Sequence, residues 1–247
     1  MKLRVDNIAF RYDDEPLFKG LSFDVAAGEF VSILGPSGCG KSTVLNLLAG
    51  ILTPEGGSMF VDDAPIRGMS SHFAYMPQND LLFPWKTIMQ NVCLHGRIHG
   101  TEKAARERAL KLFTLFGLAG YEDAWPSDLS GGMRQRAAFL RTALCDADIL
   151  LLDEPFGALD VISRGDMQDW LVSMKRHLGR TCLLVTHDID EAIFLSDRIL
   201  VLGGRPADIR SEYRVVEAHR TRDWLYAQGE LRHRLHDSIR GLEAGKC

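Results

Sequence analysis

The chain has 247 residues, of which 46% are hydrophobic and 25% charged, and its formal net charge is -4. These values are typical of one globular α/β domain that buries a full core, and the mild acidity argues against a nucleic-acid-binding protein. No apolar run approaches the roughly 18 residues that a membrane span needs. The start of the chain lacks the apolar core of a secretion signal, and the five cysteines are scattered without metal-type spacing. We therefore expect a cytosolic protein with reduced thiols.

Two stretches near the N-terminus, residues 3–10 and 21–25, alternate apolar and polar residues and predict strands. Tyr12 lies between them, upstream of the glycine-rich loop described next. An aromatic ring at this place can stack on an adenine. Taken alone, however, Tyr12 is more typical of a half-buried strand residue than of a base-stacking one.

A phosphate-binding loop is predicted at residues 35–43, because the pattern G-x-x-x-x-G-K-[ST] follows an apolar strand at 30–34 and precedes helical residues at 44–49. The glycines let backbone N–H groups surround a polyphosphate, and the helix adds the positive end of its dipole. We expect Lys41 to reach the β- and γ-phosphates and the Ser42 hydroxyl to bind Mg²⁺. The predicted nucleotide contacts of the loop are Gly35, Pro36, Ser37, Gly38, Cys39, Gly40, Lys41, Ser42 and Thr43. Cys39 itself is either a reactive thiol or an inert small filler.

Short strands are next predicted at residues 58–61 and 73–76, and Gln78 follows the second. The Gln78 side chain is placed to reach a metal or an attacking water, although its spacing alone favours a solvated loop residue. From about residue 83 to 146 the apolar residues follow helical periods. This pattern predicts a helical lobe inserted into the α/β core.

A second anion site is predicted inside that lobe, at residues 128–136. Ser130 is a good N-cap, and Gly131 and Gly132 expose the first N–H groups of the helix that follows. The site contains no lysine. If it lies on a separate lobe, it serves a different nucleotide from the one that Lys41 holds.

The apolar run 149–152 ends in two acids, Asp153 and Glu154, and reads as a buried parallel strand that opens into the site. We expect Asp153 to hold Mg²⁺ through water and Glu154 to orient a water for attack on the γ-phosphate. The alternative is a pair of acids that merely end a strand, which the upstream phosphate loop disfavours.

His187 follows another predicted buried strand, residues 181–186, at the same edge of the sheet. A histidine there can donate to the γ-phosphate or to the water, although a lone histidine at a strand end is usually structural. A strand at 198–202 closes the core. Near the C-terminus, the apolar spacing of Leu231, Leu235, Ile239 and Leu242 predicts a final amphipathic helix.

Over roughly residues 1–210 the motifs resemble, in order, those of the ATP-binding subunit of an ABC transporter. The resemblance rests on the aromatic Tyr12, the Walker A loop 35–43, the Q-loop Gln78, the signature 129–136, Walker B ending in Asp153 and Glu154, the D-loop 158–160 and the switch His187. The signature is far more specific than the Walker A loop alone, and both at this spacing are close to decisive.

The resemblance implies an α/β fold with a P-loop NTPase (RecA-like) core, N-terminal antiparallel β strands and an inserted α-helical subdomain. The whole chain, 1–247, would form one ABC ATPase domain. The core would comprise residues 1–82 and 147–210, the helical subdomain 83–146, and a C-terminal helical tail 211–247.

The resemblance also implies an ATPase that uses ATP and Mg²⁺ and works as a homodimer. Catalysis would fall to Glu154, His187 and Gln78, and the metal to Ser42, Gln78 and Asp153. The signature residues Ser130, Gly131, Gly132 and Gln135 would contact the ATP held by the partner subunit, and Asp160 would form the D-loop contact. The dimer would drive integral membrane permease subunits through the groove near Gln78.

Two segments, residues 81–87 and 187–192, look like the bacterial importers of nitrate, sulfonates, taurine and thiamine-precursor pyrimidines. This likeness implies an extracytoplasmic solute-binding protein and a place on the cytoplasmic face of the bacterial inner membrane, with no nucleic-acid partner. Alternatives are an exporter or lipid-handling cassette and a non-transport ABC ATPase. The second lacks support, because neither a second cassette nor a long coiled-coil insertion is present. A cassette that binds ATP without cleaving it is disfavoured by the presence of Glu154, Gln78 and His187.

Overall fold

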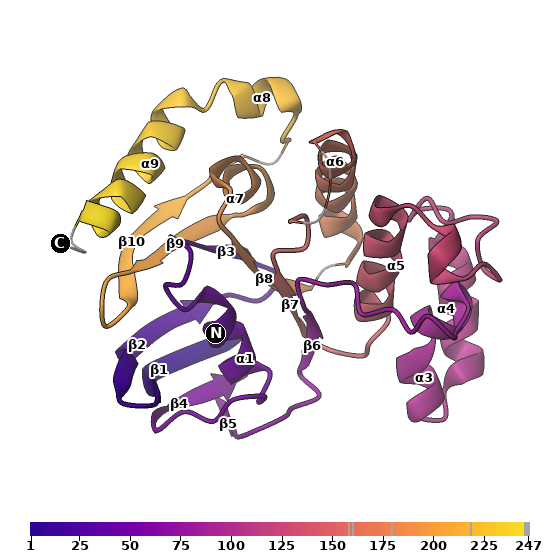
Figure 1. Cartoon of the computed structure of the whole chain (residues 1–247), viewed down its shortest axis with the longest axis horizontal. Coiled ribbons are helices and arrows are strands. Elements are labelled where there is room, and N and C mark those ends of the chain that lie inside the picture. The colour runs from indigo at the N-terminus through magenta and orange to yellow at the C-terminus, as the bar shows by residue number, and fades with distance from the viewer. Residues whose placement is uncertain (158, 160, 179, 218, 245–247) are drawn as a thin grey trace.

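The computed structural model describes residues 1–157, 159, 161–178, 180–217 and 219–244. Within these ranges two β-sheets and their helices form the architecture, with the helical lobe at one end and the C-terminal helices at the other (Figure 1). No helix in the described part of the chain combines the length and the apolar character needed to cross a bilayer.

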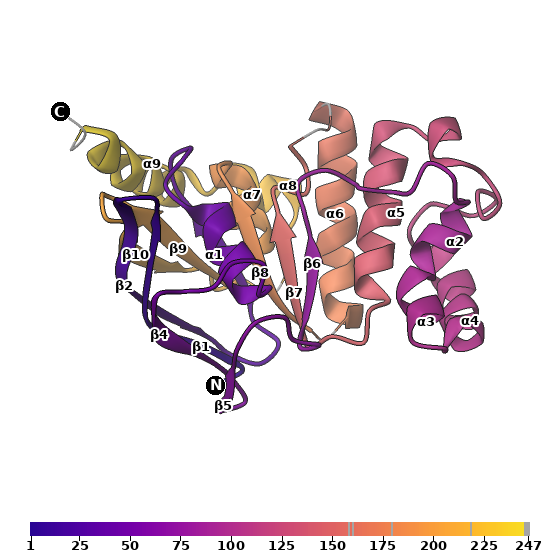
Figure 2. The same cartoon turned by 60° about the horizontal axis from the view of Figure 1, so that its bottom comes forward.

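The smaller sheet is antiparallel and has the order β2-β1-β4-β5. Its strands are β1 (Leu3–Tyr12), β2 (Glu15–Val25), β4 (Gly56–Val61) and β5 (Ala64–Ile66). Alternate residues of β1 and β2 are buried against helix α1 (Lys41–Leu48) and one face of the larger sheet. Helix α1 is therefore held between the two sheets, as Figure 2 shows.

The larger sheet has the order β10-β9-β3-β8-β7-β6. Strands β3 (Phe30–Leu34), β6 (Phe73–Met76), β7 (Ile149–Asp153), β8 (Thr181–Thr186) and β9 (Arg198–Gly203) are parallel, and β10 (Asp208–Arg214) pairs antiparallel at the edge. Every residue of β3, β7 and β8 is buried, because helices or the smaller sheet cover both faces. The C-terminal ends of these three strands meet at one edge, and this edge carries the site.

The helical lobe lies between β6 and β7, as the sequence predicted. It contains α2 (Ile88–Val92), α3 (Leu94–Ile98), α4 (Glu102–Phe113), the 3-10 turn η1 (Pro126–Asp128) and α5 (Gly131–Ala143). Helix α6 (Val161–Leu178) lies beside α5.

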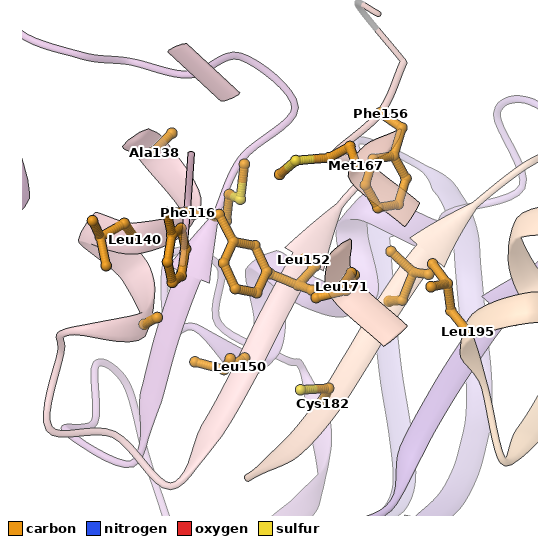
Figure 3. Close-up of a cluster of buried hydrophobic side chains, with 14 of the residues drawn as sticks. Phe116, Ala138, Leu140, Leu150, Leu152, Phe156, Met167, Leu171, Cys182 and Leu195 are labelled. Carbon is orange, nitrogen blue, oxygen red and sulfur yellow. The ribbon is translucent and has the colours of Figure 1, made fainter. Parts of the chain in front are cut away.

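The lobe and the larger sheet share one apolar core. In Figure 3, Phe116 and Leu140 of the lobe lie near Leu150 and Leu152 of β7. The Trp170 ring of α6 packs edge-on against Phe116, with ring centroids 4.2 Å apart. Since buried cores are closely packed, these contacts fix where helix α5 begins relative to the sheet.

The C-terminal part contains α7 (Ile189–Leu195), α8 (Arg222–Tyr226) and α9 (Gly229–Ala244). Leu235 of α9 is fully buried, and Leu231, Ile239 and Leu242 pack beside it on the predicted apolar face. Strand β10 runs past residue 210 to Arg214, so the regular helical structure of the tail begins at Arg222 and not at residue 211.

Candidate nucleotide site

The loop between β3 and α1 has a backbone conformation that requires glycine at several positions. Gly38 and Gly40 have φ values of 76° and 102°, in the left-handed region that favours glycine. A Cβ atom on Gly35 would lie 2.2 Å from the carbonyl oxygen of Leu202 on β9. These glycines therefore allow the loop to curve tightly against the sheet edge.

Lys41 is buried, and its side chain reaches back to the first two residues of this loop. Its Nζ donates to the carbonyl oxygens of Gly35 and Pro36, each at 2.9 Å. A cavity of about 360 Å³ lies over the loop. Its lining residues are Tyr12, Leu17, Ser37, Gly38, Gly40, Lys41, Ser42, Thr43 and Glu154. The cavity thus combines a lysine, two loop glycines and three serine or threonine hydroxyls around the start of a helix, which is the chemistry of a polyphosphate site.

Tyr12, at the end of β1, forms one wall of the cavity. Its ring packs edge-on against Phe10 at a centroid distance of 4.9 Å, and its hydroxyl lies 3.3 Å from Thr43 Oγ1. Half of the residue's surface remains exposed. An exposed aromatic ring beside a phosphate loop offers a face on which a base can stack.

Asp153, at the end of β7, accepts two hydrogen bonds. Ser42 Oγ donates to Oδ1 at 3.0 Å, and the Tyr75 hydroxyl donates to Oδ2 at 3.1 Å. Burial raises the pKa of the Asp153 carboxyl, and these two hydrogen bonds oppose the rise. Burial also raises the pKa of Tyr75, and the charge of Asp153 adds to it. The paired oxygens of Ser42 and Asp153 are hard donors, which suit Mg²⁺.

Tyr75 was not predicted as a site residue. It lies on β6 opposite Leu151 of β7, so its hydroxyl reaches the acid two residues further along the neighbouring strand. Residues 73–76 were predicted as a strand, but the sequence does not show which strand pairs with it, so it gives no signal for this contact.

Glu154 contacts the other two predicted catalytic side chains, His187 and Gln78. Its Oε1 lies 3.2 Å from His187 Nδ1, and its Oε2 accepts from Gln78 Nε2 at 3.2 Å. The three side chains follow β7, β8 and β6, so the shared edge of the sheet positions them. Gln78 thus contacts Glu154, whereas the hard oxygens that suit Mg²⁺ belong to Ser42 and Asp153.

The backbone at Glu154 is unusual. Its φ is 43°, in the left-handed region, and its N–H donates to the carbonyl of Val185 at 2.9 Å. Such a conformation in a residue other than glycine costs on the order of 1–3 kcal/mol and tends to occur at functional sites. The hydrogen bond to β8 holds the turn that directs the carboxylate toward His187.

The signature residues lie on a different element from the cavity lining. Ser130 caps α5 by accepting from the backbone N–H of Met133 at 3.3 Å, and Ser130 and Gly131 are exposed while Gly132 is buried. Gln135 is buried, and its Nε2 donates to the Pro155 carbonyl at 2.6 Å. Gln135 therefore supports the turn after Glu154 within one chain. The predicted D-loop residue Asp160 lies outside the described residues.

Cys39 is buried, which favours the inert of the two interpretations. It lines a second cavity of about 430 Å³ between the loop, the β9–β10 turn and Leu242 of α9. Tyr12 and Gly38 also line this cavity, so the two cavities are neighbours.

The site can be compared with known proteins. Residues 18–157, more than half of the chain, match the family model described as ABC transporter. The taurine import ATP-binding protein TauB of Yersinia pestis is 40% identical over 229 residues, which cover 92% of this chain and 88% of TauB. The formylaminopyrimidine import ATP-binding protein ThiZ of Halalkalibacterium halodurans is 45% identical over 206 residues, which cover 83% of this chain and 80% of ThiZ.

Solved structures agree with this assignment. The structure of cbiO1 from Clostridium perfringens, part of the ABC transporter complex cbiONQ, is similar with a TM-score of 0.78 and 25% identity, and the match covers 95% of this chain and 98% of that one. The dimeric post-hydrolysis structure of the ATP-binding cassette MJ0796 with ADP and Pi is similar with a TM-score of 0.73 and 27% identity, over 87% of this chain and 99% of that one. The chain belongs to the ABC transporter family.

Proposed function

We propose that this chain is the ATP-hydrolysing subunit of a bacterial importer for a small solute. The contact of Glu154 with both His187 and Gln78, beside the phosphate loop, carries the hydrolytic part of the proposal. The importer part is supported by relatives named as import ATP-binding proteins for taurine, aliphatic sulfonates and formylaminopyrimidine, at 40%, 44% and 45% identity.

ATP binds with its base on the exposed face of Tyr12 and its phosphates against the loop amides. Lys41 then exchanges its carbonyl contacts with Gly35 and Pro36 for the β- and γ-phosphate oxygens. Ser42 and Asp153 would hold Mg²⁺, which would neutralise phosphate charge. The Ser42 hydroxyl and the Asp153 carboxylate lie 3.0 Å apart, so hard oxygen donors of the kind that Mg²⁺ prefers are adjacent beside the phosphate loop.

Hydrolysis uses the side chains at the sheet edge. The Glu154 carboxylate accepts a hydrogen bond from a water, orients it toward the γ-phosphorus and takes its proton as the new P–O bond forms. The bond from the γ-phosphorus to the bridging oxygen breaks, and ADP and phosphate leave. His187 donates to the γ-phosphate oxygens, and its contact with Glu154 keeps both groups in register.

Two copies complete each site. Ser130 and Gly131 are exposed at the start of α5, on the helical lobe, whereas the loop cavity lies on the core. In the proposed dimer the backbone N–H groups at Ser130, Gly131 and Gly132 face the ATP of the partner subunit. Gln135, which is buried against Pro155, instead supports the turn after Glu154 in its own chain. Because each ATP bridges two chains, its binding stabilises the closed dimer by mass action and its hydrolysis removes the bridge.

The dimer acts on membrane permease subunits at the cytoplasmic face of the bacterial cell membrane, and an extracytoplasmic solute-binding protein delivers the solute. Leu81 and Trp85, after Gln78, are exposed large apolar residues of the kind that mark protein interfaces. The presence of a solute-binding protein in the complex distinguishes an importer from an exporter.

Co-purification tests this part of the proposal. The tagged chain, expressed with the genes beside it, is expected to recover a permease and a solute-binding protein. The ATPase rate of the reconstituted complex is expected to rise when the loaded binding protein is added. Taurine, an alkanesulfonate, nitrate and formylaminopyrimidine are the solutes to compare. If a permease is recovered but the ATPase rate of the reconstituted complex responds to no binding protein, import is contradicted.

A further inference from the structure

Glu191, in the first turn of α7, is 4% exposed, and the mechanism above does not use it. Its Oε2 accepts a hydrogen bond from Thr186 Oγ1 at 2.5 Å. Thr186 is the last residue of β8 and is 1% exposed. The two side chains therefore form a buried polar pair on either side of the turn that carries His187.

The pair fixes the backbone on both sides of the switch histidine. Thr186 Oγ1 also accepts from the backbone N–H of Asp188 at 3.0 Å. The Thr186 hydroxyl, which comes just before His187 in the chain, thus bonds to the backbone of Asp188, which comes just after it. Because the hydroxyl has one proton, giving it to Glu191 leaves a lone pair oriented toward the Asp188 N–H.

Two further contacts hold the same turn. Asp188 caps α7, and its Oδ1 accepts from the N–H groups of Asp190 and Glu191 at 2.8 and 3.1 Å. Arg164 of α6 reaches this region from the neighbouring helix, with Nη1 3.5 Å from Asp188 Oδ2 and Nε 4.0 Å from Glu191 Oε1. These groups close a network around His187, whereas the His187 side chain itself is exposed and contacts Glu154.

The turn also begins beside the phosphate loop. Thr186 lies opposite Leu34 in the parallel register of β8 and β3, and Gly35 is the next residue of the loop. The position of Thr186 therefore relates the histidine to the site where the γ-phosphate binds.

We infer that Glu191 and Thr186 act as a pair of positioning residues that hold His187 where it can contact both Glu154 and the γ-phosphate. The inference rests on the proposed role of His187 in ATP hydrolysis. Neither residue lines the loop cavity, so the pair affects turnover more than ATP binding. The hydrogen-bonding capacity of Glu191, more than its charge, is the property required.

The test compares side chains of similar size in the full-length chain. Glu191→Met removes the hydrogen bond between Thr186 and Glu191, and Thr186→Val removes this bond and the one from the Asp188 N–H; both keep most of the volume. Each is expected to lower kcat for ATP about tenfold or more, the rate equivalent of at least one lost hydrogen bond, with KM for ATP changed less than twofold. Thr186→Ser and Glu191→Gln keep a donor and an acceptor, and are expected to restore most of the rate. The double variant Thr186→Val/Glu191→Met is expected to be no slower than the slower single variant, because both remove the same contact.

Thr142→Val is the matched control, since Thr142 is also buried and its hydroxyl donates only within its own helix, to Ala138 at 3.0 Å. It is expected to keep kcat within twofold of wild type. The inference is overturned if Glu191→Met turns over ATP as fast as Glu191→Gln, if the two single losses add, or if Thr142→Val is equally slow. If Thr186→Val does not fold, the Met and Gln variants of Glu191 still decide. A His187→Ala variant with wild-type kcat would instead remove the proposed role of His187 itself, a failure distinct from that of the pair.

Discussion

Replacing Glu191 with glutamine is predicted to change how the stability of this protein depends on pH. Burial raises the pKa of Glu191 to about 7 from about 4.5, and the charge of Asp188 adds to the rise. The Thr186 hydrogen bond, Arg164 and His187 oppose it. The folded chain therefore binds this proton more tightly than the unfolded chain, so the stabilisation is complete below pH 4.5 and is lost as the pH rises toward 7.

The magnitude follows from these two pKa values. Their difference corresponds to about 3 kcal/mol of unfolding free energy, most of which is lost between pH 5 and pH 8. Glutamine cannot ionise, so this pH-dependent loss disappears in Glu191→Gln. The stability of the variant relative to wild type should therefore increase by about 2–3 kcal/mol from pH 5 to pH 8. Any constant cost of burying the amide cancels in this comparison.

Equilibrium urea unfolding at pH 5, 6, 7 and 8, followed by tryptophan fluorescence, measures the effect. Glu107→Gln is the control for the loss of one carboxylate, because Glu107 is exposed on α4. Parallel pH curves for wild type and Glu191→Gln would show that burial does not raise this pKa, and would refute the reasoning.

Two other substitutions test the nucleotide site. Lys41→Ala should weaken ATP binding by tenfold or more, because the cavity loses its buried cation. Titration with a fluorescent nucleotide measures the affinity, and Lys103→Ala, on the exposed face of α4, is the control. An unchanged affinity of Lys41→Ala for ATP would rule out the loop assignment. Tyr12→Ala should raise KM for ATP about fivefold with kcat nearly unchanged, since stacking contributes about 1 kcal/mol to binding. Tyr12→Phe keeps the ring and is the control. Equal KM values for the two variants in steady-state ATPase assays would exclude stacking.

The central strands were predictable because burial on both faces leaves a continuous apolar run. Strands at 30–34 and 181–186 occur at the predicted bounds, and the predicted run 149–152 extends by one residue to Asp153. The edge strand β10 was missed, since its residues 208–214 alternate half-buried and exposed positions and include four charged side chains. Its pairing depends on β9, which a local pattern does not reveal.

The site was predictable where its residues follow the ends of parallel strands. Glu154 and His187 meet because β7 and β8 are neighbours and end at the same edge. The hydrogen bonds of Tyr75 and Glu191 were not predictable in this way. Tyr75 depends on which strand lies beside β7, and Glu191 on a helix that turns back over the end of its own strand.

Dimerisation of the Glu154→Gln variant tests the central claim most directly, that each reaction centre is completed by a second copy of the chain. The variant keeps the loop and the Gln78 contact but lacks the carboxylate that takes the proton from water, so ATP should remain bound. Size-exclusion chromatography with light scattering is expected to show a two-chain species with ATP and Mg²⁺, and a one-chain species with ADP. A one-chain species at saturating ATP and Mg²⁺ would contradict the claim.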